Sequence, residues 1–416
     1  MKSVAILSPD TVPLCLYKDA PSEIEINNKR YSIRDKCTRS TAVGIRAWNI
    51  AKVLSMQPDL VVTLFIPDVN YPGKDNIDLE GINFEILPYN LDAAAWGWSE
   101  ELDRKIINRG INFIIVPSVL GVGFLNCSVL PSNINVILDG YVPVLAELPC
   151  SLIGQSNISK KIFWNRFIEQ YMALLRRANC ILYANDMQLP YYEGQLFSIG
   201  KLDWKAYQFS TLLKVPYGID VNIPIEENPD KSEKLNLLWY GPAFAWYYPE
   251  KLLEIAAENP NISIDFVALA HPRYNKSYYS FFKKFFSNDS NDMRHNVSLI
   301  EEFQDNRLDI YKDYDAGILL SRDWIEEKYS VRGRIYDMVS HGLPVITNKR
   351  NPVFHEFREL KDSVYPISLD SLEEDINILI KKKSEIKVSE ESLRYLQDKF
   401  QWAKVLYPLV DYVRNF

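Results

Sequence analysis

Asp313–Asn348, with the sequence DYDAGILLSRDWIEEKYSVRGRIYDMVSHGLPVITN, contains one strand–helix–strand pattern. The apolar run Ala316–Leu320 predicts a buried strand that is followed by a polar loop. A helix is expected over Val331–His341, and Gly342-Leu343-Pro344 then predicts a turn into a second strand at Pro344–Ile346. Short apolar strands joined by a helix are typical of a parallel sheet that helices cover on both faces.

The same alternation of strand and helix extends toward both ends of the chain. Upstream, the pattern predicts strands at Val4–Leu7, Leu60–Phe65, Phe113–Val116, Val136–Leu138 and Cys180–Ala184, with helices at Ile45–Leu54 and Glu100–Asn108. After residue 217 it restarts, with strands at Leu235–Tyr240, Ile262–Ala268 and Val297–Ile300 and helices at Pro249–Asn259 and Tyr274–Phe286. Two arrays of similar size predict two domains.

The length supports this division, because 416 residues exceed what one hydrophobic core usually covers. We expect an α/β protein with two facing Rossmann-like domains, residues 1–217 and 218–388, and a cleft between them. The polar stretch Asn222–Lys234 reads as the linker. A C-terminal helix over residues 389–416, interrupted at Pro408, is expected to pack back on the first domain.

Composition excludes several classes of function. The formal net charge of −7 gives no electrostatic support for nucleic-acid binding. The five cysteines are scattered and show no C-x-x-C, which predicts reduced thiols in a cytoplasmic protein and no zinc site. No signal peptide and no apolar run of about 18 residues is recognisable, so no membrane-spanning helix is expected. G-x-G-x-x-G and P-loop motifs are absent, which disfavours dehydrogenases and NTPases.

The loop and helix that follow Leu320 are the main candidate site. A helix beginning near Ser330 would offer free N–H groups and a positive dipole end, which suit a diphosphate. Arg332 and Arg334 can add charge and bidentate donors, and Asp337 can accept hydrogen bonds from ribose hydroxyls. The alternative is that the arginines are solvated and Asp337 is an ordinary helix charge. Their place after a strand of an α/β sheet favours a site.

The first half offers a second group of candidates. Gly44, at the start of a helix, would let a ligand approach the backbone closely, although a simple tight turn explains it equally. Arg46 can help to neutralise a diphosphate. Asp139 can act as general base toward an acceptor hydroxyl; the alternative is that it fixes its loop by hydrogen bonds to backbone N–H groups.

Two further features are candidate ligand contacts. His271 can donate to a phosphate or a base, and the alternative is a structural histidine. Asp313 and Asp315 form a D-x-D, but they precede their strand and therefore face the wrong edge of the sheet for a metal on a nucleotide sugar. No metal site is predicted.

The quoted stretch resembles the donor-binding segment of the family-four glycosyltransferases, which have the two-domain GT-B architecture. It is most similar to a branch with an arginine pair in place of part of the E-x7-E motif, whose second acidic position matches Asp337. Tyr329 stands where the first glutamate would be, and Glu326 upstream is expected to meet the donor sugar hydroxyls. The similar segments extend over nearly the whole chain: Gly44–Trp48, Leu138–Pro143, Val215–Asp220, Trp239–Pro242 and Ala270–Pro272.

The resemblance implies a glycosyltransferase that moves a sugar from a nucleotide-diphosphate donor to a glycan, lipid-linked or other acceptor. It implies retention of configuration, no metal and no cofactor beyond the donor, with Gly241, His271, Glu326, Ser330, Arg332, Arg334 and Asp337 binding the donor. Many members carry an Arg and a Lys after the Gly241 loop, whereas this chain has none there. That departure favours the alternative of a non-catalytic scaffold that binds a nucleotide or sugar.

Two basic and aromatic stretches, Lys160–Arg177 and Tyr274–Phe286, allow contact with the inner face of a membrane, which would suit a lipid-linked acceptor. The alternative is a pair of core-facing helices with snorkelling lysines.

Overall fold

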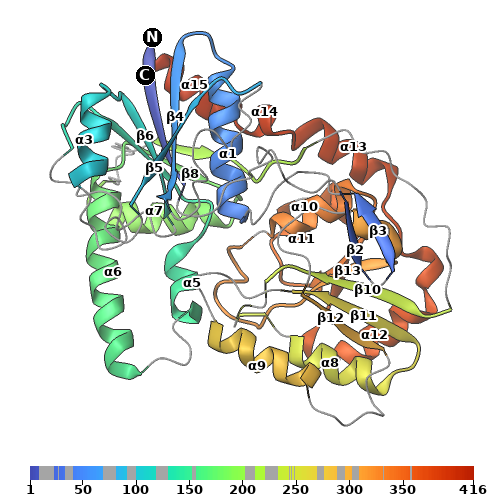
Figure 1. Cartoon of the computed structure of the whole chain (residues 1–416). Helices are drawn as coiled ribbons and strands as arrows, with labels where there is room; N and C mark the ends of the chain where they lie inside the picture. Colours follow the sequence, from blue (N-terminus) through green and yellow to red (C-terminus); the bar gives the residue numbers. More distant parts are fainter. Residues whose placement is uncertain are drawn as a thin grey trace.

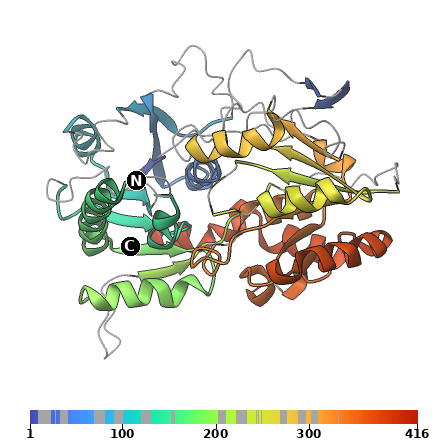
Figure 2. The ribbon, with the colours of Figure 1, turned by 90° about the horizontal axis from the view of Figure 1, so that it is seen from below.

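The computed structural model describes residues 1–8, 23–26, 28–32, 41–68, 81–90, 100–118, 130–151, 156–201, 211–220, 233–242, 244, 246–247, 249–268, 276–287, 296–301, 309–330, 332–356 and 358–416. Figure 1 shows two lobes, each built around its own sheet, and Figure 2 shows them side by side from below.

The first lobe contains a parallel sheet in the order β5-β4-β1-β6-β7-β8-β9. The strands are β1 Lys2–Leu7, β4 Leu60–Pro67, β5 Glu85–Tyr89, β6 Phe113–Pro117, β7 Asn135–Asp139, β8 Cys180–Tyr183 and β9 Thr211–Lys214. Alternate residues of β1 enter different cores: Val4 and Ile6 face one side, Ala5 and Leu7 the other. A strand with both faces buried reads as a continuous apolar run, as the sequence showed.

Helices cover both faces of this sheet. Helix α1 (Ala42–Ser55) packs on the face of Val4 and Ile6. The opposite face is covered by helices α3 Glu100–Asn108, α5 Val144–Ser151, α6 Asn157–Arg177 and α7 Gln188–Ser198. A short antiparallel hairpin, β2 Glu23–Ile26 and β3 Lys29–Ser32, stands apart from the sheet, and β3 contacts the 3-10 helix Asp309–Asp313.

The second lobe has a parallel sheet in the order β12-β11-β10-β13-β14-β15. Its strands are β10 Leu235–Tyr240, β11 Ile262–Val267, β12 Val297–Ile300, β13 Ala316–Leu319, β14 Val345–Asn348 and β15 Val364–Ile367. Its helices are α8 Pro249–Glu258, α9 Lys276–Ser287, α10 Gly333–Ser340, α11 Val353–Glu356 and α12 Leu372–Lys381. The expectation of two parallel α/β sheets is confirmed.

Several predicted boundaries were wrong. The helix expected at Val331 begins at Gly333, because Arg332 keeps extended backbone angles as the N-cap residue. The weaker strands β5, β9 and β15 were not predicted. The linker expected at Asn222–Lys234 lies mostly outside the described residues.

The C-terminal segment forms three helices and not one interrupted helix. Helix α13 (Glu390–Lys399) packs on α10, while α14 (Trp402–Val405) contacts α1. Helix α15 (Tyr407–Asn415) returns to β1, where Lys2 Nζ donates to Val413 O at 3.1 Å. Pro408 lies in the first turn of α15, where its missing N–H costs no helical hydrogen bond. The segment therefore fastens both lobes together (Figure 1).

Candidate functional site

The loop between β13 and α10 brings the predicted donor residues to the joint between the lobes. Gly333, the first residue of α10, lies against the ring of Tyr217 at the end of the first domain, and an added Cβ would touch that ring at 3.0 Å. Asn185 and Gln188 of the first domain each donate to Tyr329 O at 3.0 Å. The N-terminus of α10 is thus fixed by contacts from the opposite lobe.

Arg332 is held in a buried cage of oxygen atoms. Its Nη1 and Nη2 donate to the two carboxylate oxygens of Glu326 at 2.5 and 2.6 Å. Nη2 also donates to Glu327 Oε2 and to Ser321 Oγ, each at 3.0 Å. Glu326 accepts these bonds from a position six residues before Arg332, and its expected contact with the donor sugar hydroxyls stays a prediction.

One polar atom in this cage, Arg332 Nε, has no hydrogen-bond partner within the described part of the chain, and its side chain is only 8% exposed. The neighbouring Ser330 hydroxyl is also buried and faces the carboxyl group of Glu147. No side chain caps the N-terminus of α10 either, so its first N–H groups lack a capping acceptor. Buried polar atoms without partners are rare in folded proteins, and ligands commonly complete them.

Tyr247 joins the two arginines of the predicted pair. Its ring lies 5.1 Å from Arg332 Cζ and 5.0 Å from Arg334 Cζ. Arg334 also donates to the Tyr247 hydroxyl and to Tyr240 O. The sequence did not predict a role for Tyr247, since an aromatic residue in a loop gives no sign of which cation it contacts.

Gly241 directly follows β10, next to Arg334, and has a φ of +117°. An added Cβ would collide with the guanidinium of Arg334. A glycine is required here both for the backbone conformation and for the close approach of that cation.

Glu147, on α5, adds a carboxyl group from the first domain. Burial raises the pKa of Glu147 to about 8, and the negative charge of Glu326 adds to the rise while Arg332 opposes it. Burial also raises the pKa of Glu327, although Arg332 opposes the rise. Glu147 therefore holds its proton at neutral pH, and the joint carries less negative charge than its carboxyl groups suggest.

Asp337 and His341 lie one turn apart on α10. Tyr311 OH donates to Asp337 Oδ2 at 2.7 Å, and His341 forms the C-cap of the helix. The expected contact of Asp337 with ribose stays a prediction; its carboxylate is 13% exposed.

Arg46 and Asp139 form a separate ion pair inside the first domain. Arg46 Nε lies 2.8 Å from Asp139 Oδ2, while Nη1 and Nη2 donate to Pro216 O and Val215 O. The pair therefore fixes α1 to the end of β7 and to the domain junction. The proposed proton transfer to Asp139 and the diphosphate contact of Arg46 stay predictions.

Gly44 and His271 complete the set of predicted residues. Gly44 lies in the first turn of α1, where its N–H donates to Thr41 Oγ1 at 3.1 Å, so this N–H already has a partner. His271 lies outside the described residues.

The D-x-D motif and the two basic and aromatic stretches have local structural explanations. Asp315 accepts from Asn236 N and pairs with Lys383 Nζ, each at 2.8 Å. Among the described residues, no group of three or more His, Cys, Asp or Glu side chains could hold a metal ion. The apolar faces of α6 and α9 enter the cores through Phe167, Tyr171 and Phe282. None of the helices in the described residues has the length and apolar character needed to cross a bilayer.

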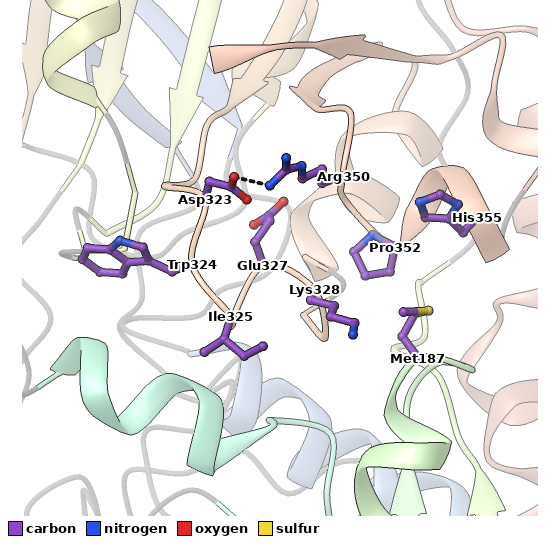
Figure 3. A pocket seen from close by; sticks show the side chains of 9 residues that line it. All are labelled: Met187, Asp323, Trp324, Ile325, Glu327, Lys328, Arg350, Pro352 and His355. Carbon is purple, nitrogen blue, oxygen red and sulfur yellow. Dashed lines mark hydrogen bonds and ion pairs between the residues drawn. The ribbon is translucent and has the colours of Figure 1, made fainter. Parts of the chain in front are cut away.

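A pocket of about 440 Å³ opens beside this site. Its walls come from the loops after β13 and β14 and from Met187 of the first domain, as Figure 3 shows. The lining residues are Met187, Asp323, Trp324, Ile325, Glu327, Lys328, Arg350, Pro352 and His355. Glu327 is shared between this pocket and the cage of Arg332.

Comparisons with known proteins agree on the fold. No family model matches the sequence, and no curated protein matches it significantly. The structure is similar to sucrose-phosphate synthase from Thermosynechococcus elongatus, with a TM-score of 0.68 and 11% identity over 100% of this chain and 98% of that one. The chain has the GT-B fold.

Two further solved structures share this fold over the whole chain. Anabaena HepE in complex with UDP-glucose gives a TM-score of 0.62 at 11% identity and covers 100% of both chains. AviGT4, a glycosyltransferase involved in avilamycin A biosynthesis, gives 0.53 at 12% identity over 100% of this chain and 97% of its own.

Proposed function

We propose that this protein is a glycosyltransferase that moves a sugar, as a hexosyl group, from a nucleotide-diphosphate donor. The observation that carries the proposal is the buried atom Arg332 Nε, which has no hydrogen-bond partner among the described residues, beside the uncapped N-terminus of α10. Such a set of donors at the carboxyl end of a parallel strand suits a phosphate. The solved structure of HepE with UDP-glucose, which shares this fold, supports the choice of donor.

The proposed site stabilises the charge that develops on the leaving diphosphate as the bond from the sugar C1 to the phosphate oxygen breaks. Helix N–H groups and Arg334 supply oriented donors in a partly dry joint. Protonated Glu147 adds no negative charge against the diphosphate. Retention of configuration, independence of metals and membership of family four with its arginine-pair branch belong to this proposal through the sequence resemblance.

The acceptor in this proposal is a glycan or a lipid-linked saccharide, reached in the cytoplasm or at the inner face of its membrane. It approaches from the first domain, where Arg46 and Asp139 fix the end of β7. Closure of the lobes around both substrates would keep water from hydrolysing the donor.

A thermal-shift series tests the donor site. UDP, GDP, TDP, CMP and ADP are each added at about 1 mM. For a Kd on the order of 10 µM this is about 100 times the Kd, and binding then stabilises the folded protein by about 2.7 kcal/mol. We expect one nucleoside diphosphate to raise Tm, and Arg334→Ala to weaken its binding at least about tenfold, since a charge-assisted hydrogen bond is lost. Arg394→Ala, exposed on α13, is the control and should bind like the parent. No shift with any of the five nucleotides would rule out the donor site.

A non-catalytic nucleotide- or sugar-binding scaffold is the second candidate. The observation that favours it is the cage itself, because Glu326 and Glu327 already neutralise Arg332. The two functions separate in an assay of donor hydrolysis, in which an enzyme slowly releases sugar from the stabilising nucleotide sugar. Binding without any release over hours would select the scaffold.

A further inference from the structure

The pocket beside the Arg332 cage lies where three parallel strands end. Its walls follow β8, β13 and β14, and ligands of open α/β sheets bind outside such carboxyl ends. Its volume of about 440 Å³ falls in the range of small-molecule sites. The buried side chain of Glu327 separates it from Arg332.

The chemistry of the pocket divides into two parts. Trp324, Ile325, Met187 and Pro352 provide apolar surface, and the Ile325 side chain is 54% exposed. An indole face with aliphatic neighbours suits the C–H face of a pyranose ring, because it removes apolar area from water.

The remaining wall carries two cations, Lys328 and Arg350, and two carboxylates, Asp323 and Glu327, of which Glu327 is paired with Arg332 outside the pocket. Lys328 makes no ion pair within the described residues and lies 5.5 Å from the ring of Tyr329. Arg350 pairs with Asp323, but both side chains are more than half exposed, so the pair is weak. Figure 3 shows Lys328 and Arg350 at the pocket with Glu327 between them.

We propose that this pocket binds the acceptor, a saccharide that carries an anionic group, with its ring against Trp324 and its anion at Lys328. This proposal rests on the proposed transferase function. The position fits an acceptor that approaches from the first domain, because that domain contributes Met187 to a pocket whose other lining residues belong to the second domain. Met187 adjoins Gln188, which donates to Tyr329 O across the contact between the domains. The anionic group is a phosphate or a carboxylate, which Lys328 recognises equally as a point charge.

Ligand-observed NMR on the full chain, saturated with UDP to occupy the donor site, tests the pocket. The probes are glucose 6-phosphate, glucuronic acid and neutral glucose. We expect at least one anionic probe to bind about tenfold more tightly than glucose, and Lys328→Gln to remove that advantage. The stronger anionic probe identifies phosphate or carboxylate as the anion. Lys404→Gln, exposed on α14, is the matched control and should leave the affinities unchanged.

Trp324→Leu gives an independent arm, in which all three sugars should bind several-fold more weakly. The proposed acceptor site is wrong if Lys328→Gln and the parent bind the anionic probe equally well, or if no probe binds to the parent at about 20 mM. Weaker UDP binding in Lys328→Gln would also overturn it, by placing the donor there. If none of the five nucleotides gives a thermal shift while the Lys328-dependent binding persists, the saccharide site stands and the transferase function fails.

Discussion

Arg46 and Arg332 are both buried guanidinium groups, one in each lobe, and they differ in how completely they are paired. Arg46 meets one carboxylate, Asp139, and its remaining nitrogens donate to two backbone carbonyls. Arg332 meets two carboxylates and a hydroxyl, yet its Nε has no partner in the described residues. A balanced and saturated pair holds structure together, whereas an unbalanced and unsaturated one leaves capacity for a ligand.

The origin of the partners explains the difference. Asp139 and the carbonyls of Val215 and Pro216 lie far from Arg46 in the sequence, so that pair cross-links α1, β7 and the junction. Glu326 and Glu327 lie within six residues of Arg332, so that cage belongs mainly to one loop. Asn351 Nδ2 joins it to the loop after β14 by donating to Glu327 Oε1 at 2.9 Å.

The largest effect is expected when the balanced pair is broken. Arg46→Met should lower the free energy of unfolding by about 3–5 kcal/mol, because Asp139 remains buried without a counter-charge. Urea denaturation of the full chain measures it. The double variant Arg46→Met with Asp139→Leu should recover most of the loss, since no lone charge then remains. A loss below about 1 kcal/mol in the single variant would contradict a structural role for this pair.

A pH series sharpens the comparison on the unbalanced side. The pKa of Glu147 rises from 4.5 to about 8 on folding, so the folded state binds this proton more tightly than the unfolded chain does. The contribution of Glu147 to the stability of the folded state is therefore complete below pH 4.5 and is lost as the pH rises to about 8.

Glu147→Gln keeps a neutral side chain at every pH. At about pH 8.5 the variant should be more stable than the parent by on the order of 2 kcal/mol, and near pH 4.5 the two should be equally stable. The Glu147 side chain is partly exposed, which keeps the difference below what the whole pKa shift would give. Tm across the pH range measures the difference. Glu258→Gln, at an exposed side chain, is the control, and its Tm should change with pH as that of the parent does. Parallel curves of Tm against pH for Glu147→Gln and the parent would contradict a raised pKa of Glu147.

The smallest effect concerns Tyr247, which lies between the two arginines. Tyr247→Phe keeps the ring against both guanidinium groups but removes the acceptor of Arg334. Stability should fall by about 1 kcal/mol, and nucleotide affinity should fall severalfold as Arg334 loses its fixed position. Denaturation and the thermal-shift series measure these two quantities. Tyr407→Phe, at a side chain that is 66% exposed, is the control and should change neither stability nor nucleotide affinity. If Tyr247→Phe binds nucleotide like the parent, Arg334 does not need Tyr247 to bind the nucleotide.

The sequence by itself determined the fold class and most of the central elements. Leu235–Tyr240 and Glu100–Asn108 were predicted with the bounds that the structure gives, because the period of apolar residues is a local property of the chain. Motif order also placed the GT-B fold, since its segments follow one another along the chain. The sequence did not predict β9, whose residues are only half-buried, or β15, whose apolar run contains Pro366.

Only the tertiary structure decided what the charged residues contact. The sequence showed Arg332 and Arg334 two positions apart and could not tell that Glu326 and Glu327 enclose the first while Tyr240 and Tyr247 hold the second. Nor could it show that Glu147 meets this cage or that Arg46 pairs with Asp139. Pairing of charges depends on distances between segments remote in sequence and on burial, and folding alone fixes both.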